Sequence, residues 1–245
     1  SSDNLDAWSA YHLGLQYLYR FNRNDNAVAA ELFEHAVKQD KSFARAYAGL
    51  SFVHFQTAFM RQTDDIAGEI KLARTCAQRG IDIDPLDPFA NFTMGRSYWL
   101  ESDLDSASSW LERATSLSPN YAQGLYALAW TNTIAGADQD GGERLDLAMR
   151  LSPLDPLYYA MLGARGFTHI AREEYAEAVA WTEQAARSPG ARHAGHGLHR
   201  AGRRAADPHL AGADPHHADR AASDPQGLPG PGVPAGDPGR HPLLG

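Results

Sequence analysis

The chain of 245 residues is 43% hydrophobic and carries a formal net charge of −8. This negative charge argues against direct binding of nucleic acids or anionic membranes, and no apolar run is long enough to predict a membrane-spanning helix. The single cysteine, Cys76, excludes a disulfide framework within one chain and favours a reducing compartment, so the sequence predicts a cytoplasmic protein.

Three prolines recur at a fixed interval, because Pro85, Pro119 and Pro153 each lie 34 residues after the one before. Each closes a stretch that contains an apolar segment, a turn and a second apolar segment with an alanine. A period of this length is typical of repeats built from two short helices. We therefore predict an all-α chain in which residues 1–189 form an array of about five helical hairpins. The predicted units are 7–41, 44–85, 88–119, 122–153 and 156–189.

The first two units are irregular. Residues 7–41 contain the pair Leu13-Gly14, but Lys41 stands where the later units have proline. Residues 44–85 end on a proline, yet their two halves agree with the period only if about ten residues are inserted between them. We expect the extra residues to lengthen the helices or the turn near 62–65.

The third unit, residues 88–119, follows the pattern most closely. Gly95 and Ala107 are small, so the two helices of this hairpin can approach each other, and Ala114 does the same for the next hairpin. Pro119 ends the second helix because proline lacks an N–H group and restricts the residue before it.

The last two units depart from the pattern at single positions. Gly141 replaces the alanine of the fourth unit, which predicts a second helix that begins late. The fifth unit has the pair Leu162-Gly163 in its first helix and Ala178 and Ala185 in its second, at the positions that the repeat assigns to them. This unit ends at Ser188-Pro189.

The composition changes abruptly after residue 189. Residues 190–245 hold eight of the 14 prolines, seven of the 11 histidines and half of the 22 glycines, and lack aromatic rings other than histidine. Such a tail cannot bury enough apolar surface to fold stably. We consider three interpretations: a disordered tail, a histidine-rich metal-binding tail, and translation of a GC-rich gene in the wrong frame. We favour the frame-shift artefact and place metal binding last, because no cysteine accompanies the histidines.

No catalytic constellation is present in the sequence. It has no Gly-rich phosphate loop, no HExxH, no paired CxxC and no GxSxG motif. Asp84 and Asp87 flank Pro85 and fit a turn between repeats better than an acid–base pair. We expect Cys76 to be a buried packing thiol. The sequence therefore predicts a protein that is not an enzyme and has no cofactor and no metal site.

Residues 88–119 resemble a tetratricopeptide repeat (TPR), through Met94-Gly95, Tyr98, Ala107, Leu111, Ala114 and Pro119. The resemblance extends over the other units and implies a TPR superhelix, an α–α solenoid whose first helices line a concave groove. Mapping the groove positions of the family onto this chain gives the candidate partner-binding residues Trp8, Tyr11, Tyr19, Arg45, Phe52, Phe55, Phe89, Phe92, Arg96, Trp99, Tyr126, Trp130 and Phe167.

This candidate groove is strongly aromatic, and Arg45 and Arg96 are its only cations. Chaperone-binding members of the family carry Lys, Arg and Asn there, so we expect an apolar peptide or helix, another domain of the same full-length protein, or a second copy in a homodimer. The phrases at 43–50 and 84–90 resemble the TPR regions of bacterial winged-helix transcriptional regulators and of class III adenylate cyclases. That resemblance implies a noncatalytic regulatory module, or alternatively the regulatory fragment of a cyclase.

Overall fold

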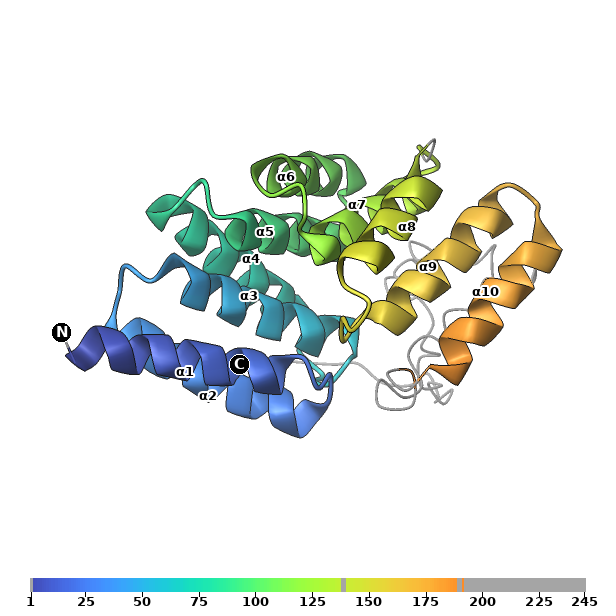
Figure 1. The fold of residues 1–245 in the computed structure, drawn as a ribbon. Coiled ribbons are helices and arrows are strands. Elements are labelled where there is room, and N and C mark those ends of the chain that lie inside the picture. Colours follow the sequence, from blue (N-terminus) through green and yellow to red (C-terminus); the bar gives the residue numbers. More distant parts are fainter. Residues whose placement is uncertain (1, 138–139, 189–190, 192–245) are drawn as a thin grey trace, which may run out of the picture. The chain divides into compact units, whose positions relative to one another are not determined.

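The computed structural model describes residues 2–137, 140–188 and 191, all of which lie in one compact unit, Ser1–Gly197. The interpretations of residues 192–245 fall outside the described residues. The described part of the chain contains ten α-helices and no strand (Figure 1). The helices are α1 (Ser2–Leu18), α2 (Arg23–Gln39), α3 (Ala44–Phe59), α4 (Ile66–Ile83), α5 (Pro88–Leu100), α6 (Leu104–Leu117), α7 (Ala122–Ala135), α8 (Gly141–Leu151), α9 (Tyr158–Ala171) and α10 (Tyr175–Arg187).

Consecutive helices pack in pairs, so that α1 with α2, and each later pair up to α9 with α10, forms a hairpin (Figure 1). The first helices of neighbouring hairpins also pack on one another, in the order α1, α3, α5, α7 and α9. We call these five helices the first-helix layer. The all-helical prediction and the five hairpins are confirmed within the described residues.

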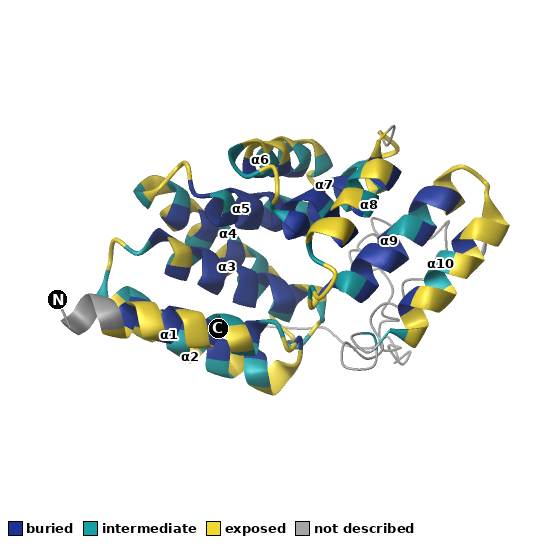
Figure 2. Cartoon of the chain, in the orientation of Figure 1, coloured by how far each residue is buried: buried dark blue, intermediate teal, exposed yellow. Residues whose placement is uncertain are grey.

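The first-helix layer is the more buried of the two layers (Figure 2). In α5, nine of 13 residues are buried, whereas in α6 only Ala107, Leu111 and Ala114 are. A first helix packs against its hairpin partner and against the first helices on either side, so few of its faces reach solvent. The small residues of the second helices mark the single stripe that faces inward.

Helix starts and turns follow from local sequence. The side chains of Asn22, Asp65, Asp87 and Asp103 accept the N–H of the third residue beyond each, which caps α2, α4, α5 and α6. Among the described residues, each turn within a hairpin contains one residue with positive φ; these residues are Phe21, Arg61, Ser102, Gly136 and Glu173. Only one of the five is glycine. In the other four turns the N–H of this residue donates to the carbonyl oxygen three residues before it, which closes the turn.

The irregularities of the second and fourth units have clear structural origins. Helices α3 and α4 contain 16 and 18 residues, against 13 and 14 in α5 and α6, and the turn at 60–65 is also longer. The predicted insertion is therefore shared among both helices and the turn. The predicted late start of the fourth unit's second helix is confirmed, since α8 begins only at Gly141 and has 11 residues.

The predicted close approach of the two helices is present in the third hairpin. A Cβ added to Gly95 would lie 2.7 Å from Leu111 Cγ and 3.0 Å from the Ala107 carbonyl oxygen. In the fifth hairpin Gly163, at the corresponding position of the repeat, makes no such approach, since a Cβ there meets nothing within 4 Å. Gly166 makes the approach instead, at 3.2 Å from the Ala178 carbonyl oxygen.

The shift of three residues in the fifth hairpin matches the length of the segment that contains α9. Glu173, the positive-φ residue after α9, lies 17 residues after Pro156, whereas Ser102, the positive-φ residue after α5, lies 14 residues after Pro88. Gly166 therefore occupies the place that Gly95 has in the third hairpin. None of the described helices combines the length and the apolar character needed to cross a bilayer.

Candidate functional site

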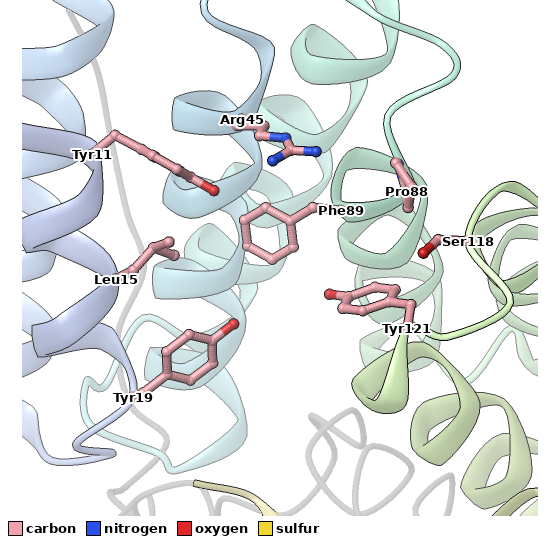
Figure 3. Close-up of a pocket in the computed structure, with 8 residues that line it drawn as sticks. All are labelled: Tyr11, Leu15, Tyr19, Arg45, Pro88, Phe89, Ser118 and Tyr121. Atoms are coloured by element: carbon pink, nitrogen blue, oxygen red, sulfur yellow. The ribbon is translucent and has the colours of Figure 1, made fainter. Parts of the chain in front are cut away.

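A pocket of about 260 Å³ lies between the first, second and third hairpins and the turn that leads into the fourth. Its walls come from α1, from the first residues of α3 and α5, and from the segment that joins α6 to α7 (Figure 3). The phenol hydroxyls of three tyrosines and the guanidinium of Arg45 surround the ring of Phe89 (Figure 3). The lining residues are Tyr11, Leu15, Tyr19, Arg45, Pro88, Phe89, Ser118 and Tyr121.

The charge in this pocket is held in place by an ion pair across two hairpins. Arg45 Nε donates a hydrogen bond to Asp87 Oδ2 at 2.6 Å, and Asp87 Oδ1 accepts the N–H of Ala90 at 2.9 Å. Only 4% of the Asp87 side chain is exposed, against 54% for Arg45. The hydrogen bond to Asp87 raises the pKa of Arg45. A fixed cation therefore lies at the mouth of the pocket.

The phenols of the pocket are hydrogen-bond donors near neutral pH. Burial raises the pKa of Tyr11 to about 12, and it also raises the pKa values of Tyr19 and Tyr121. The Tyr19 hydroxyl donates to Gln123 Oε1 at 3.1 Å, whereas the buried Tyr121 hydroxyl has no partner among the described residues. The pocket thus combines aromatic walls with O–H and N–H donors.

The end of the first hairpin's first helix also contacts the last two hairpins. Gln123, which accepts the Tyr19 hydrogen bond, donates to Asp155 at 3.4 Å. Phe21 forms a small core cluster with Leu157, Tyr159 and Ala160. These contacts join the turn after α1 to α7 and to the start of α9.

The predicted partner-binding residues fall into three classes of exposure. Trp8 and Arg45 are exposed. Tyr19, Trp99, Tyr126, Trp130 and Phe167 are partly buried. The remaining six are buried: Tyr11, Phe52, Phe55, Phe89, Phe92 and Arg96. Four of the 13, Tyr11, Tyr19, Arg45 and Phe89, line the pocket.

Many of the buried aromatics pack between neighbouring first helices. The ring centroids of Phe52 and Phe92 are 5.4 Å apart, and those of Phe55 and Phe59 stack at 5.6 Å. Towards the ends of α3 and α5, Phe59 remains 49% exposed and contacts Trp99 at 5.7 Å. Part of the aromatic set therefore belongs to the core, and part reaches the surface.

Four lining residues, Leu15, Pro88, Ser118 and Tyr121, are not among the 13 predicted groove residues. The last three lie at or before the start of a first helix, outside the positions that the family uses for groove residues. The chain does carry a signal there, because Phe43 and Tyr121 both stand directly before the alanine that begins a first helix. An aromatic residue directly before a first helix in two units indicates that these side chains pack against the first-helix layer.

Two histidines, a residue type often used in acid–base catalysis, each pair with a glutamate outside the pocket. His54 Nδ1 lies 2.7 Å from Glu69 Oε2, and His169 Nδ1 lies 2.6 Å from Glu174 Oε2. The described residues contain no group of three or more His, Cys, Asp or Glu side chains that could hold a metal. Asp84 and Asp87 accept backbone N–H groups in the turn before α5, as predicted.

Cys76 is a free thiol on α4, and burial raises its pKa to about 11. At pH 8 we therefore expect the thiolate fraction of native Cys76 to be at least about a hundredfold lower than that of an ordinary cysteine. Alkylation by iodoacetamide, followed by mass spectrometry, should be slowed by a similar factor in the native protein relative to the urea-unfolded chain. Equal rates in the two states would contradict the burial of this thiol.

Solved structures with the same fold are TPR proteins. TTC0263, a thermophilic TPR protein of Thermus thermophilus, matches with a TM-score of 0.59 and 18% identity, over 75% of this chain and 91% of that one. PilF of Pseudomonas aeruginosa matches with a TM-score of 0.55 and 18% identity, over 76% and 78% of the two chains. No protein-family model matches the sequence, and a comparison with curated proteins gives no match. The fold is thus that of a TPR solenoid.

Proposed function

We propose that this chain is a noncatalytic interaction module that binds a peptide or a helix of a partner protein on its first-helix layer. The proposal rests on the pocket, which four of the candidate residues line and which combines aromatic walls with a fixed cation and the unpartnered hydroxyl of Tyr121. Aromatic and arginine side chains at the centre of an interface carry much of its binding energy. A partner segment would bury apolar side chains there and satisfy the donors.

The surface aromatics extend this site beyond the pocket. Trp130 contacts the ring of Phe167 at 5.1 Å between centroids, and both side chains are partly exposed. Together with Phe59 and Trp99 they give the ends of the first helices an apolar surface on which an extended or helical segment can lie.

The regulatory setting is also part of the proposal. The resemblance to TPR regions of bacterial winged-helix regulators favours a role in which this module controls an output domain in the cytoplasm, and the alternative is control of a class III adenylate cyclase. The gene upstream of Ser1 separates the two, because it would encode either a winged helix or a cyclase domain.

Peptides selected from a displayed random library against the wild-type chain provide the test of partner binding. We expect the double variant Trp99→Ala plus Trp130→Ala to weaken binding of the selected peptides by about a thousandfold, measured by fluorescence anisotropy, since buried tryptophans at interfaces are each worth roughly 2 kcal/mol. Trp110→Ala on α6, a second helix, serves as the matched control and should bind as the wild type does. Unchanged affinity of the double variant would exclude the tryptophans of α5 and α7 from the binding face, and unchanged affinity of Phe89→Ala as well would exclude the pocket.

A further inference from the structure

Arg96, on α5, is a buried cation without a counter-charge. Only 6% of the residue is exposed, and among the described residues it forms neither an ion pair nor a hydrogen bond, with Nε and Nη1 both buried and unpartnered. Other inward arginines have partners, since Arg74 binds Glu101 and Arg165 binds Asp146. Burying an unpaired charge is costly, so this position calls for an explanation.

The surroundings of Arg96 supply rings but no negative charge. Its guanidinium carbon lies 4.1 Å from the centre of the Phe55 ring and 5.4 Å from that of Trp99. The ionisable groups that interact with its charge are the phenols of Tyr126 and Tyr121, whose pKa values burial raises, so they stay neutral near pH 7. Burial lowers the pKa of Arg96 only to about 10, and it therefore remains a cation.

The unpartnered buried polar atoms near the guanidinium can all donate a hydrogen bond. Besides the two nitrogens of Arg96, they are Trp99 Nε1 and the Tyr121 hydroxyl, on α5 and directly before α7. The other unpartnered buried atoms of the described residues are amide oxygens of Asn26, Gln56 and Asn91, and their own NH₂ groups are hydrogen-bonded. Guanidinium and indole N–H groups can only donate, so Arg96 and Trp99 lack an acceptor, and the charge of Arg96 favours a negatively charged one.

We propose that Arg96 binds the side-chain carboxylate of an Asp or Glu in the partner segment, an inference that rests on the proposed function. A carboxylate presents two acceptor oxygens in the plane that a guanidinium fork matches. The guanidinium carbon lies over the Phe55 ring, and Nε and Nη1 have no partner among the described residues. Because only 6% of Arg96 is exposed, the slender side chain of an Asp or Glu fits this position better than a chain terminus, which would bring its backbone along.

This role predicts an unusual sign for the effect of a substitution on stability. Arg96→Met keeps a side chain of similar length and removes the unpaired charge, so we expect the melting temperature of the free protein to rise. If Arg96 instead stabilised the fold through its ring contacts, the same variant would melt at a lower temperature. That result would overturn the proposal.

Binding is tested with the full chain by a double-mutant cycle. Library-selected peptides should contain an acidic residue at one position, and its change from Glu to Gln should weaken binding to the wild type by about tenfold or more, but leave binding to Arg96→Met unchanged. An equal loss with both proteins would refute the contact with Arg96. If peptides bind, depend on Trp99 and Trp130, and ignore Arg96, the interaction module stands and this inference fails.

A small probe makes the test independent of any selected peptide. N-acetylglutamate α-methylamide should shift the NMR signal of the Arg96 Nε–H group, whereas N-acetylglutamine α-methylamide should not. N-acetylglycine and inorganic phosphate represent a chain terminus and a phosphate group. A stronger response to either of these, or equal responses to the glutamate and glutamine probes, would overturn the assignment to a side-chain carboxylate.

Discussion

Replacing Phe33 by alanine is expected to lower the free energy of unfolding by about 3–5 kcal/mol, the usual loss for a fully buried phenylalanine. Phe33, on α2, is 0% exposed. Its ring fills the space left by two glycines, because a Cβ on Gly14 or on Gly49 would come within 2.7 Å or 2.8 Å of Cε1. One side chain thus joins α1 to α2 and α2 to α3.

The loss should be greatest in the first hairpin, since hairpins in a solenoid are stabilised mainly by their neighbours. Urea unfolding followed by circular dichroism measures the total effect, and hydrogen exchange should show faster exchange in α1 and α2 than in α7 and α8. Leu72→Ala is the matched control, because Leu72 lies on α4 with 45% of its surface exposed. A change of less than about 0.5 kcal/mol is expected there. Equal losses in the two variants would contradict the role of Phe33.

The repeat itself was predictable because it depends on contacts close in sequence. Small residues such as Gly95 and Ala107 face each other where a hairpin of this kind closes, and a proline follows in most units, so period and small residues together located the helices. The fifth hairpin escaped this reasoning. Gly163 and Gly166 both lie in the first helix of that hairpin, and the three extra residues between Pro156 and the turn at Glu173 decide which of them meets Ala178.

The candidate site was predictable only in part, because its geometry depends on the small rotation of each hairpin relative to the one before, and these rotations accumulate along the array. That Tyr19 would reach Gln123, 104 residues away, depends on how α1, α3, α5 and α7 are stacked and on no local pattern. Family positions identify which residues of a first helix face the layer, but the size of the neighbouring rings decides exposure. Phe52 and Phe92 fill the gap between α3 and α5 and become core, whereas Trp99 reaches the surface.

Removal of the Asp87 carboxylate should destabilise the array by roughly 3 kcal/mol, because one side chain serves two structures. Oδ1 caps α5 through the N–H of Ala90, and Oδ2 accepts from Arg45 of the preceding hairpin. The variant Asp87→Ala loses both contacts. Asp87→Asn keeps an acceptor for the helix cap and loses the charge, so we expect it to fall between the wild type and the alanine variant. Thermal and urea unfolding provide the measurement.

The matched control for Asp87 is Asp65, which caps α4 by accepting the N–H of Gly68 but forms no ion pair within the described part of the chain. Asp65→Ala should cost about 1 kcal/mol, the usual worth of a helix cap. If Asp87→Ala costs no more than this, the ion pair with Arg45 contributes nothing to stability. A larger loss means that Asp87 holds Arg45 at the pocket, and Asp87→Asn should then also weaken the selected peptides, because the cation would no longer be fixed at the place where they bind.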